Sequence, residues 1–148
     1  MPDTSDAGDD MNAADDRNTA VTLRIPMHAP GGRFVTLSDV LAHVPEGRGA
    51  AWTWRVLEFT GVGEMPGGLS VEEFEEAALE SPAGLPFDWP ALRDFAGRVE
   101  QVQDLILIAV EEGTEPDPAA LEAMDLSGSP FVIEAVDSTE WQVTDRTR

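Results

Sequence analysis

The side chains best suited to nucleophilic, acid–base or metal chemistry are scarce in this sequence. It contains two histidines, His28 and His43, and no cysteine. The lack of cysteine excludes disulfides, thiol catalysis and cysteine-ligated zinc. A hydrolytic triad needs a base beside its nucleophile, and no G-x-S-x-G element is present to expose a catalytic serine. We therefore expect neither histidine to be catalytic or to bind a metal, and we predict a protein that is not an enzyme and needs no cofactor.

Carboxylates are the abundant reactive group, and one predicted loop concentrates them. Glu111, Glu112, Glu115 and Asp117 follow one another closely there. The loop lacks the alternating oxygen ligands and the glycine of an EF-hand calcium loop. Because acidic residues are plentiful elsewhere too, no pair stands out as the acid and nucleophile of a glycosidase. We predict no specific metal site.

The charge balance narrows the classes of partner. The formal net charge is -20, with 29 acidic residues against 9 basic ones, and lysine is absent. Such a surface repels nucleic-acid phosphates and anionic lipids, whereas it attracts basic proteins and speeds encounter with them. No apolar run approaches the roughly 18 residues needed to cross a bilayer. We expect a cytoplasmic protein that binds neither nucleic acid nor membranes, with its oligomeric state left open.

A helix from Ser70 to Glu80 must position most of the charge of the folded part. Ser70 and Glu73 form a capping box at its start. Apolar residues at helical spacing form its buried stripe, namely Val71, Phe74 and Ala78. The other side is filled by glutamates, namely Glu72, Glu73, Glu75, Glu76 and Glu80.

This acidic side has no cation one turn away to neutralise it. Like charges at that spacing destabilise a helix by roughly 0.2–0.5 kcal/mol per pair. Two interpretations are open, a solvated face and an interaction face. Under the second, the predicted partner-binding residues are Glu72, Glu73, Glu76, Glu80, Glu111 and Glu112.

The same central stretch continues with a second helix and a strand. Asp88 is the expected N-cap of the helix, and Pro90 is tolerated in its first turn. One face of the helix is apolar, formed by Leu92, Phe95, Ala96, Val99 and Val102. Residues 105–110 form a continuous apolar run, which predicts a strand buried on both faces. A strand, two helices and a strand in succession favour helices that cover one side of a sheet.

Shorter elements complete the expected fold. Alternation and turn residues predict strands at 21–25, 52–60, 131–136 and 141–144, with a hairpin between the last two. Ser38 is the expected N-cap of a helix over 39–44, residues 61–68 and 81–86 read as loops, and 118–124 as one or two helical turns. In the strand at 52–60, one face carries Trp52, Trp54 and Val56 as core residues, and the other carries Arg55, Leu57 and Phe59.

Residues 1–19 differ from the rest of the chain. They hold six aspartates and one arginine among small polar residues, so they cannot bury enough apolar area to offset ordering entropy. We predict a disordered acidic tail, either solubilising or a partner-binding arm, and not a secretory signal. Residues 20–148 are then expected to form a single α+β domain, with a mixed, mostly antiparallel sheet and helices packed on one face.

A spaced pattern over residues 52–143 resembles small bacterial immunity proteins of polymorphic and contact-dependent toxin systems. The pattern consists of Trp54–Phe59, Gly61–Gly63, Ser70–Phe74 with Glu75, Trp89, Leu92, Phe95–Ala96, Gln101 with Asp104, and Ile133–Trp141. The resemblance implies a cytoplasmic protein that binds and blocks a toxin without catalysis, and it transfers no residue roles. The electrostatics of acidic inhibitors of basic nucleases agree with it. The alternative is a housekeeping or regulatory protein whose acidity reflects a halophilic or high-GC host.

Overall fold

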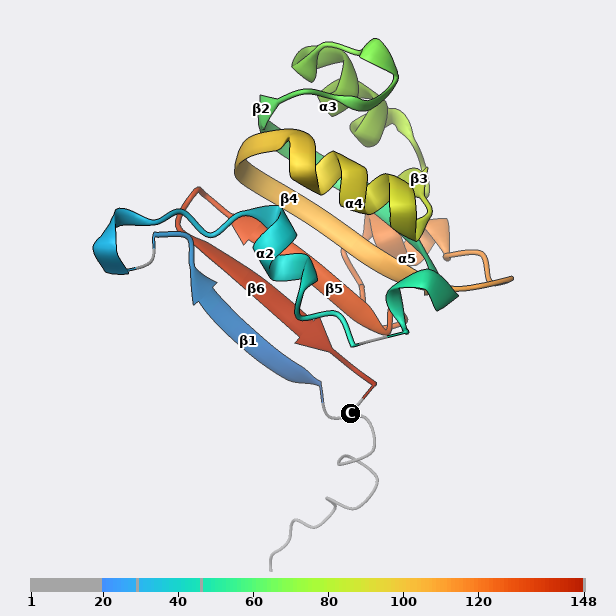
Figure 1. Ribbon diagram of the computed structural model, residues 1–148. Helices are drawn as coiled ribbons and strands as arrows, with labels where there is room; N and C mark the ends of the chain where they lie inside the picture. Colours follow the sequence, from blue (N-terminus) through green and yellow to red (C-terminus); the bar gives the residue numbers. More distant parts are fainter. Residues whose placement is uncertain (1–19, 29, 46, 148) are drawn as a thin grey trace, which may run out of the picture.

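The computed structural model describes residues 20–28, 30–45 and 47–147. They build a six-stranded sheet of order β1-β6-β5-β4-β2-β3 in which every neighbouring pair is antiparallel (Figure 1). The strands are β1 (Val21–Pro26), β2 (Trp52–Gly63), β3 (Leu85–Phe87), β4 (Val99–Glu111), β5 (Phe131–Val136) and β6 (Glu140–Asp145). The helices are α2 (Leu37–Leu41), α3 (Val71–Glu80), α4 (Trp89–Arg98) and α5 (Pro118–Glu122), with short 3-10 turns at Pro30–Gly32, Gly49–Ala51 and Pro66–Gly68. The predicted α+β class is confirmed, whereas the predicted acidic tail lies outside the described residues.

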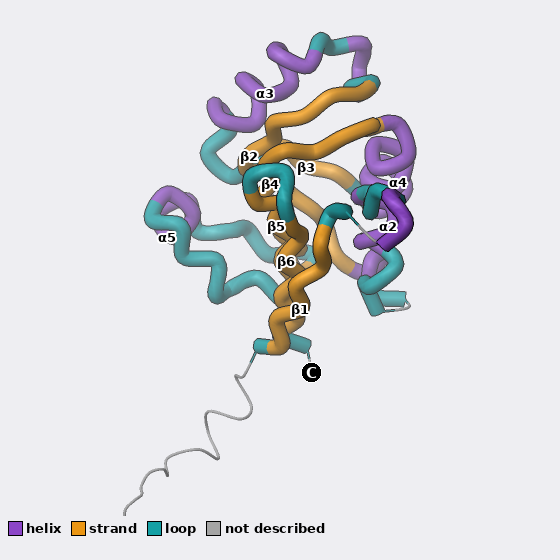
Figure 2. The backbone as a smooth tube through the Cα atoms, turned by 90° about the vertical axis from the view of Figure 1, so that its left-hand side faces the viewer, coloured by secondary structure: helices purple, strands orange, loops and turns teal. Residues whose placement is uncertain are grey.

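The sheet separates a large helical layer from a small one. Figure 2 shows α2 and α4 on the right of the strands, α3 at the top and α5 on the left. The main core lies between the sheet and α2, α3 and α4, so helices are concentrated on one face as expected. A second, smaller apolar cluster lies on the opposite face, where α5 packs, and contains Ile108, Val110, Leu121 and Val132.

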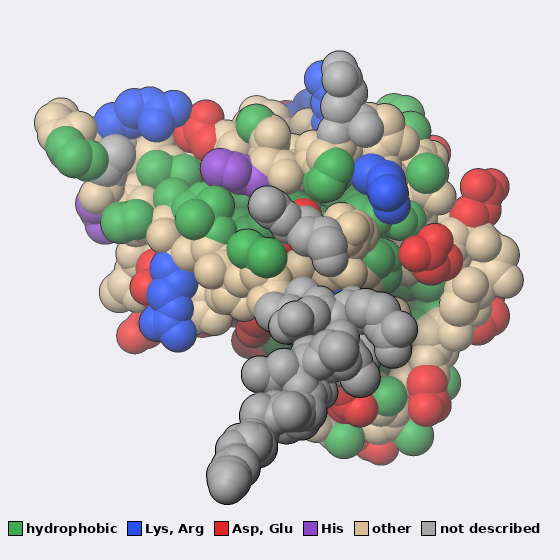
Figure 3. Space-filling model, turned by 90° about the horizontal axis from the view of Figure 1, so that it is seen from below, with side chains coloured by type: hydrophobic (Ala, Val, Ile, Leu, Met, Phe, Trp, Pro, Cys, Tyr) green, Lys and Arg blue, Asp and Glu red, His purple; other side chains and the backbone are tan. Residues whose placement is uncertain are grey.

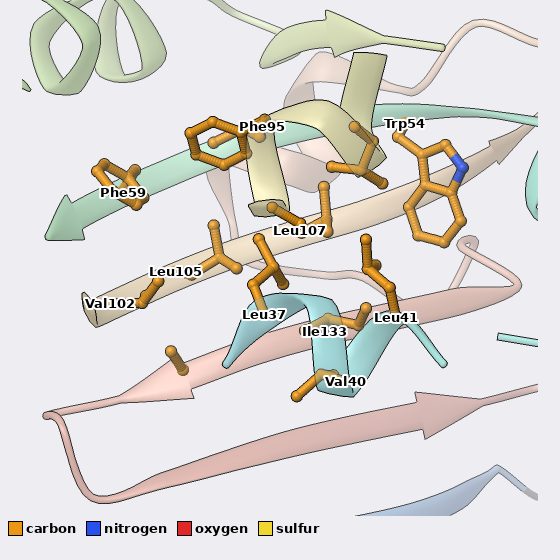
Figure 4. Close-up of a cluster of buried hydrophobic side chains, with 14 of the residues drawn as sticks. Leu37, Val40, Leu41, Trp54, Phe59, Phe95, Val102, Leu105, Leu107 and Ile133 are labelled. Atoms are coloured by element: carbon orange, nitrogen blue, oxygen red, sulfur yellow. The ribbon is translucent and has the colours of Figure 1, made fainter. Parts of the chain in front are cut away.

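The main core is rich in aromatic rings. Figure 4 shows α2 and α4 directing apolar side chains at those of the strands beneath them. Phe95 of α4 lies 5.6 Å from Phe59, 5.2 Å from Phe74 and 5.5 Å from Phe87, measured between ring centroids. Burying each such side chain stabilises the fold by roughly 1.5–3 kcal/mol.

Two tryptophans are fully buried: Trp54, which the sequence predicts as a core residue, and Trp141, which it places only in a strand. Trp54 is 0% exposed, and its indole N–H donates to the carbonyl of Gly49 over 3.0 Å. Trp141 is 1% exposed and donates to the carbonyl of Val35 over 3.0 Å. Both indoles are therefore buried without losing their hydrogen bond, which is the usual condition for burial of this side chain.

A β-bulge in β2 places Phe59 on the other face of the sheet from the one that the sequence predicts. Val56 pairs with Leu107 and Glu58 with Ile106, so Leu57 is an extra residue in β2. Because an extra residue reverses the alternation of faces, Phe59 joins Trp54 in the main core instead of lying on the opposite face. Leu57 does lie on the opposite face, as expected, against the smaller cluster.

Two further irregularities in β4 explain why α4 ends earlier than predicted. Register shifts between Thr60 and Gly61 and between Val62 and Gly63 leave one extra residue each time in β4. As a result Val99, Val102 and Leu105 all point into the main core at a spacing of three. That spacing imitates a helical face, so the sequence pattern assigned Val99 and Val102 to the helix, whereas α4 ends at Arg98.

The glycines at the end of β2 lie in a strand, although the sequence predicts a loop over residues 61–68. A Cβ at Gly61 would lie 2.4 Å from the carbonyl oxygen of Gln101, and one at Gly63 would lie 2.6 Å from the Cα of Val99. Gly63 also has a φ of 147°. These residues are therefore required for close approach of β2 to β4, and the strand continues through them to Gly63.

Two local predictions need correction elsewhere. Thr36, and not Ser38, caps α2: its hydroxyl accepts from the Asp39 amide over 3.2 Å, and Asp39 accepts from the Thr36 amide over 2.9 Å. The predicted loop at 81–86 overlaps β3, which pairs with β2 at the edge of the sheet. Pro86 is compatible with β3 because an edge strand can spare an amide donor.

Candidate protein-binding surface

Helix α3 is fixed by contacts on its inner side and at its first turn. The predicted capping box is present: the Glu73 amide donates to the Ser70 hydroxyl over 3.1 Å, and the Ser70 amide donates to the Glu73 carboxylate over 2.8 Å. Phe74 and Ala78 are each 1% exposed. Their burial turns the opposite side of the helix to solvent, so Glu72, Glu76 and Glu80 are exposed as expected.

The acidic side of α3 forms no ion pair in the described part of the chain. Ion pairs there involve other carboxylates, namely Arg24–Glu140 at 3.7 Å, Arg33–Asp39 at 3.1 Å, Arg98–Glu64 at 2.7 Å and Arg98–Asp94 at 3.0 Å. The last turn of α3 carries no basic residue either. The repulsion between its glutamates is therefore relieved by the helix dipole in the first turn, where Glu72 and Glu73 lie, and by solvent and salt.

Glu111 and Glu112 are exposed, but they lie at a different place from α3. Glu111 ends β4 and pairs with Trp52, and Glu112 follows in the turn. Seen from below, acidic side chains gather on the right of the molecule, the side to which the loop between β4 and α5 projects in Figure 1 (Figure 3). Helix α5 separates the two acidic regions, with a cavity on either side of it.

The first cavity is a groove between the end of α3, the sheet and α5, with a volume of about 490 Å³. In Figure 2, α3 lies at the top, and α5 lies below it on the left of the strands. The groove is mostly apolar. Among the described residues its lining includes no arginine and comprises Leu57, Glu58, Ala78, Leu79, Ser81, Pro82, Ile106, Pro118, Ala119, Leu121, Glu122 and Met124. Sequence reasoning missed this surface. Its one local signal is Leu79, an apolar residue outside the buried stripe of α3.

The second cavity, of about 360 Å³, lies between the end of β4 and the segment 114–129. It contains carboxylates, two of which hold the local backbone in place. Asp117 accepts from the Ala119 amide over 3.1 Å at the start of α5, and Asp125 accepts from the Ser127 hydroxyl over 2.6 Å. The hydrogen bonds from Ser127 lower the pKa of Asp125. Over the described ranges, no group of three or more histidines or carboxylates is arranged to hold a metal ion.

The histidines lie away from both cavities. The ring of His28 contacts that of Phe34 at a tilt of 51°, with centroids 4.5 Å apart, and His43 is exposed just beyond α2. Neither lines the groove or the second cavity. The groove and the second cavity therefore bring together carboxylates and aliphatic side chains, a combination suited to binding cationic and apolar groups.

Comparisons with known proteins identify no relative of this chain. None of the helices described is both long and apolar enough to cross a membrane. Neither a family model, nor a curated protein, nor a solved structure matches this chain significantly.

Proposed function

We propose that this protein binds a basic protein partner and neutralises it, as an immunity-like inhibitor of a toxin in the cytoplasm. The observation that carries the proposal is the acidic side of α3, which a capped helix with a buried inner side holds outward and which forms no ion pair with the cations that the structure describes. The likeness to immunity proteins supports the same function. Glu111 and Glu112 would extend the contact on the far side of α5.

Exposed carboxylates of this kind act chiefly on the rate of association. Complementary charge raises association rate constants from about 10⁵–10⁶ M⁻¹s⁻¹ toward 10⁸ M⁻¹s⁻¹ at low salt. The effect weakens with salt because the Debye length falls to about 3 Å at 1 M. A toxin inhibitor benefits from fast capture, since an active toxin does damage until it is bound.

The test is charge reversal at Glu72, Glu76 and Glu80 to arginine. The partner is recovered by affinity capture with the wild-type protein, and association rates are then measured at several salt concentrations. A control variant with Asp3, Asp6 and Asp9 changed to arginine has the same net charge. We expect the α3 variant to associate at least tenfold more slowly at low salt, with the difference shrinking as salt is added.

Two results would contradict the proposal. Equal rates for the α3 variant and the wild type at low salt would show a merely solvated face, and the acidity would then reflect the host. If the wild-type protein captures a basic partner without inhibiting it, the protein is a binding protein and not an inhibitor. A toxin gene adjacent to the gene for this chain would favour the proposal over a housekeeping role.

A further inference from the structure

We infer that the groove between α3 and α5 receives the apolar side of an amphipathic, basic helix of the partner. The inference rests on the proposed function and deepens it by naming the second contact. Leu79 and Met124, which line the groove, are 71% and 55% exposed and are the most exposed large apolar side chains in the described ranges. Exposed apolar groups gathered at a concave surface mark interaction sites.

The shape of the groove favours side-chain contact with a helix over the addition of a strand. Its floor includes Leu57 of β2 and Ile106 of β4, strands already paired with each other, and its walls are the helices α3 and α5. A volume of about 490 Å³ is within the usual range for binding clefts. Apolar side chains spaced three and four apart on a partner helix would enter such a groove together.

The charges at the groove select a basic occupant. Glu58 and Glu122 line it, Glu80 lies at the adjacent end of α3, and no arginine of the described ranges lines it. The chain's own residues 1–19 carry six aspartates and one arginine, so they would add like charge. A second copy would bring another net charge of -20. A helix with cations beside an apolar stripe would place its apolar side chains on the floor of the groove and its cations beside the glutamates at the edge.

The test uses two synthetic peptides with the full-length protein. One is a lysine- and leucine-containing helix with leucines at i, i+3, i+4 and i+7, and the other has the same composition in scrambled order. The protein variants are Leu79→Ser with Met124→Ser, and Val62→Ser as the matched control, since Val62 is 54% exposed and lies at the end of β2. Circular dichroism checks that each variant is folded, and fluorescence anisotropy measures affinity.

We expect the wild-type protein to bind the striped peptide at least tenfold more tightly than the scrambled one. The Leu79 and Met124 variant should lose most of that preference, chiefly through faster dissociation, and Val62→Ser should keep it. Labelled methionine methyl groups give a second readout: the Met124 signal should shift on binding, whereas buried Met27 should not. An unshifted Met124 in the bound state, or no binding of either peptide, would overturn the inference.

The failure of this inference can be told apart from failure of the proposed function. If charge reversal on α3 slows capture of the partner while the groove variant binds like the wild type, the acidic face acts without the groove. If neither variant changes association or affinity, both proposals are wrong.

Discussion

Replacing Phe95 with alanine tests the packing of α4 against the sheet. Phe95 is 1% exposed and touches three other phenylalanine rings within 5.6 Å between centroids. A buried Phe→Ala change typically costs about 3–5 kcal/mol. Each aromatic pair adds about 0.5–1.5 kcal/mol beyond its area, so we expect a loss of about 4–5 kcal/mol.

The assay is urea unfolding followed by fluorescence of the buried tryptophans. Domains of this size have about 5–15 kcal/mol of stability, so Phe95→Ala could be close to unfolded. Phe95→Leu, expected to cost about 1–2 kcal/mol, gives a measurable intermediate. Phe34→Ala is the matched control, because Phe34 is 47% exposed and should cost less than about 1 kcal/mol. A loss at Phe95 no larger than that at Phe34 would refute the packing argument.

Further predictions concern the backbone, two half-buried charges and the N-terminal segment. Gly61→Ala should destabilise the fold by about 1–3 kcal/mol, because the added Cβ would collide with the backbone of β4. Gly97→Ala in α4 should stabilise the fold by up to about 1 kcal/mol, because the added Cβ meets nothing within 4 Å. Urea unfolding midpoints in the opposite order would contradict this pair of predictions. Burial raises the pKa of Glu134, so the native state holds its proton more tightly than the unfolded state, and the free energy of unfolding should fall as pH rises from 4.5 through the raised pKa. Glu134→Gln should flatten that part of the pH–stability curve, and an unchanged slope would contradict the argument. Arg55 has a buried Nε without a hydrogen-bond partner, so Arg55→Met should be neutral or stabilising by about 1 kcal/mol in urea unfolding, and a clear loss would show that the rest of the guanidinium is needed. Deleting residues 1–19 should leave the thermal midpoint nearly unchanged, and a fall of many degrees would show that they pack on the domain.

Features specified by neighbouring residues were predictable from the sequence. The capping box of Ser70 and Glu73 and the Asp88 cap of α4 involve residues three positions apart, and both are present. The strand at 105–110 was recognisable because an apolar run bounded by acidic residues suits an interior strand. The exposure of four α3 glutamates follows from the same local periodicity, namely Glu72, Glu73, Glu76 and Glu80, whereas Glu75 is half-buried instead of exposed as predicted.

Features set by distant pairing were not predictable. Phe59 lies in the main core because of an extra residue in β2, and no local pattern distinguishes that bulge from regular alternation. Strand β3 exists because three residues pair with β2, although its own sequence resembles a turn. The groove likewise depends on α5 lying across the sheet from the main helices, a long-range placement that charge and periodicity do not encode.

The pairing of β1 with β6 has a consequence for the order in which the fold forms. Val21 lies opposite Asp145, so the first strand of the sheet finds its neighbour in the last. Closing a loop of that length is entropically costly, and contacts so distant in sequence form slowly. During synthesis β1 leaves the ribosome before the other strands and must wait until β6 has emerged, so Ile25 cannot pack against the main core until then. The edge of the sheet that is made first is thus the one completed last.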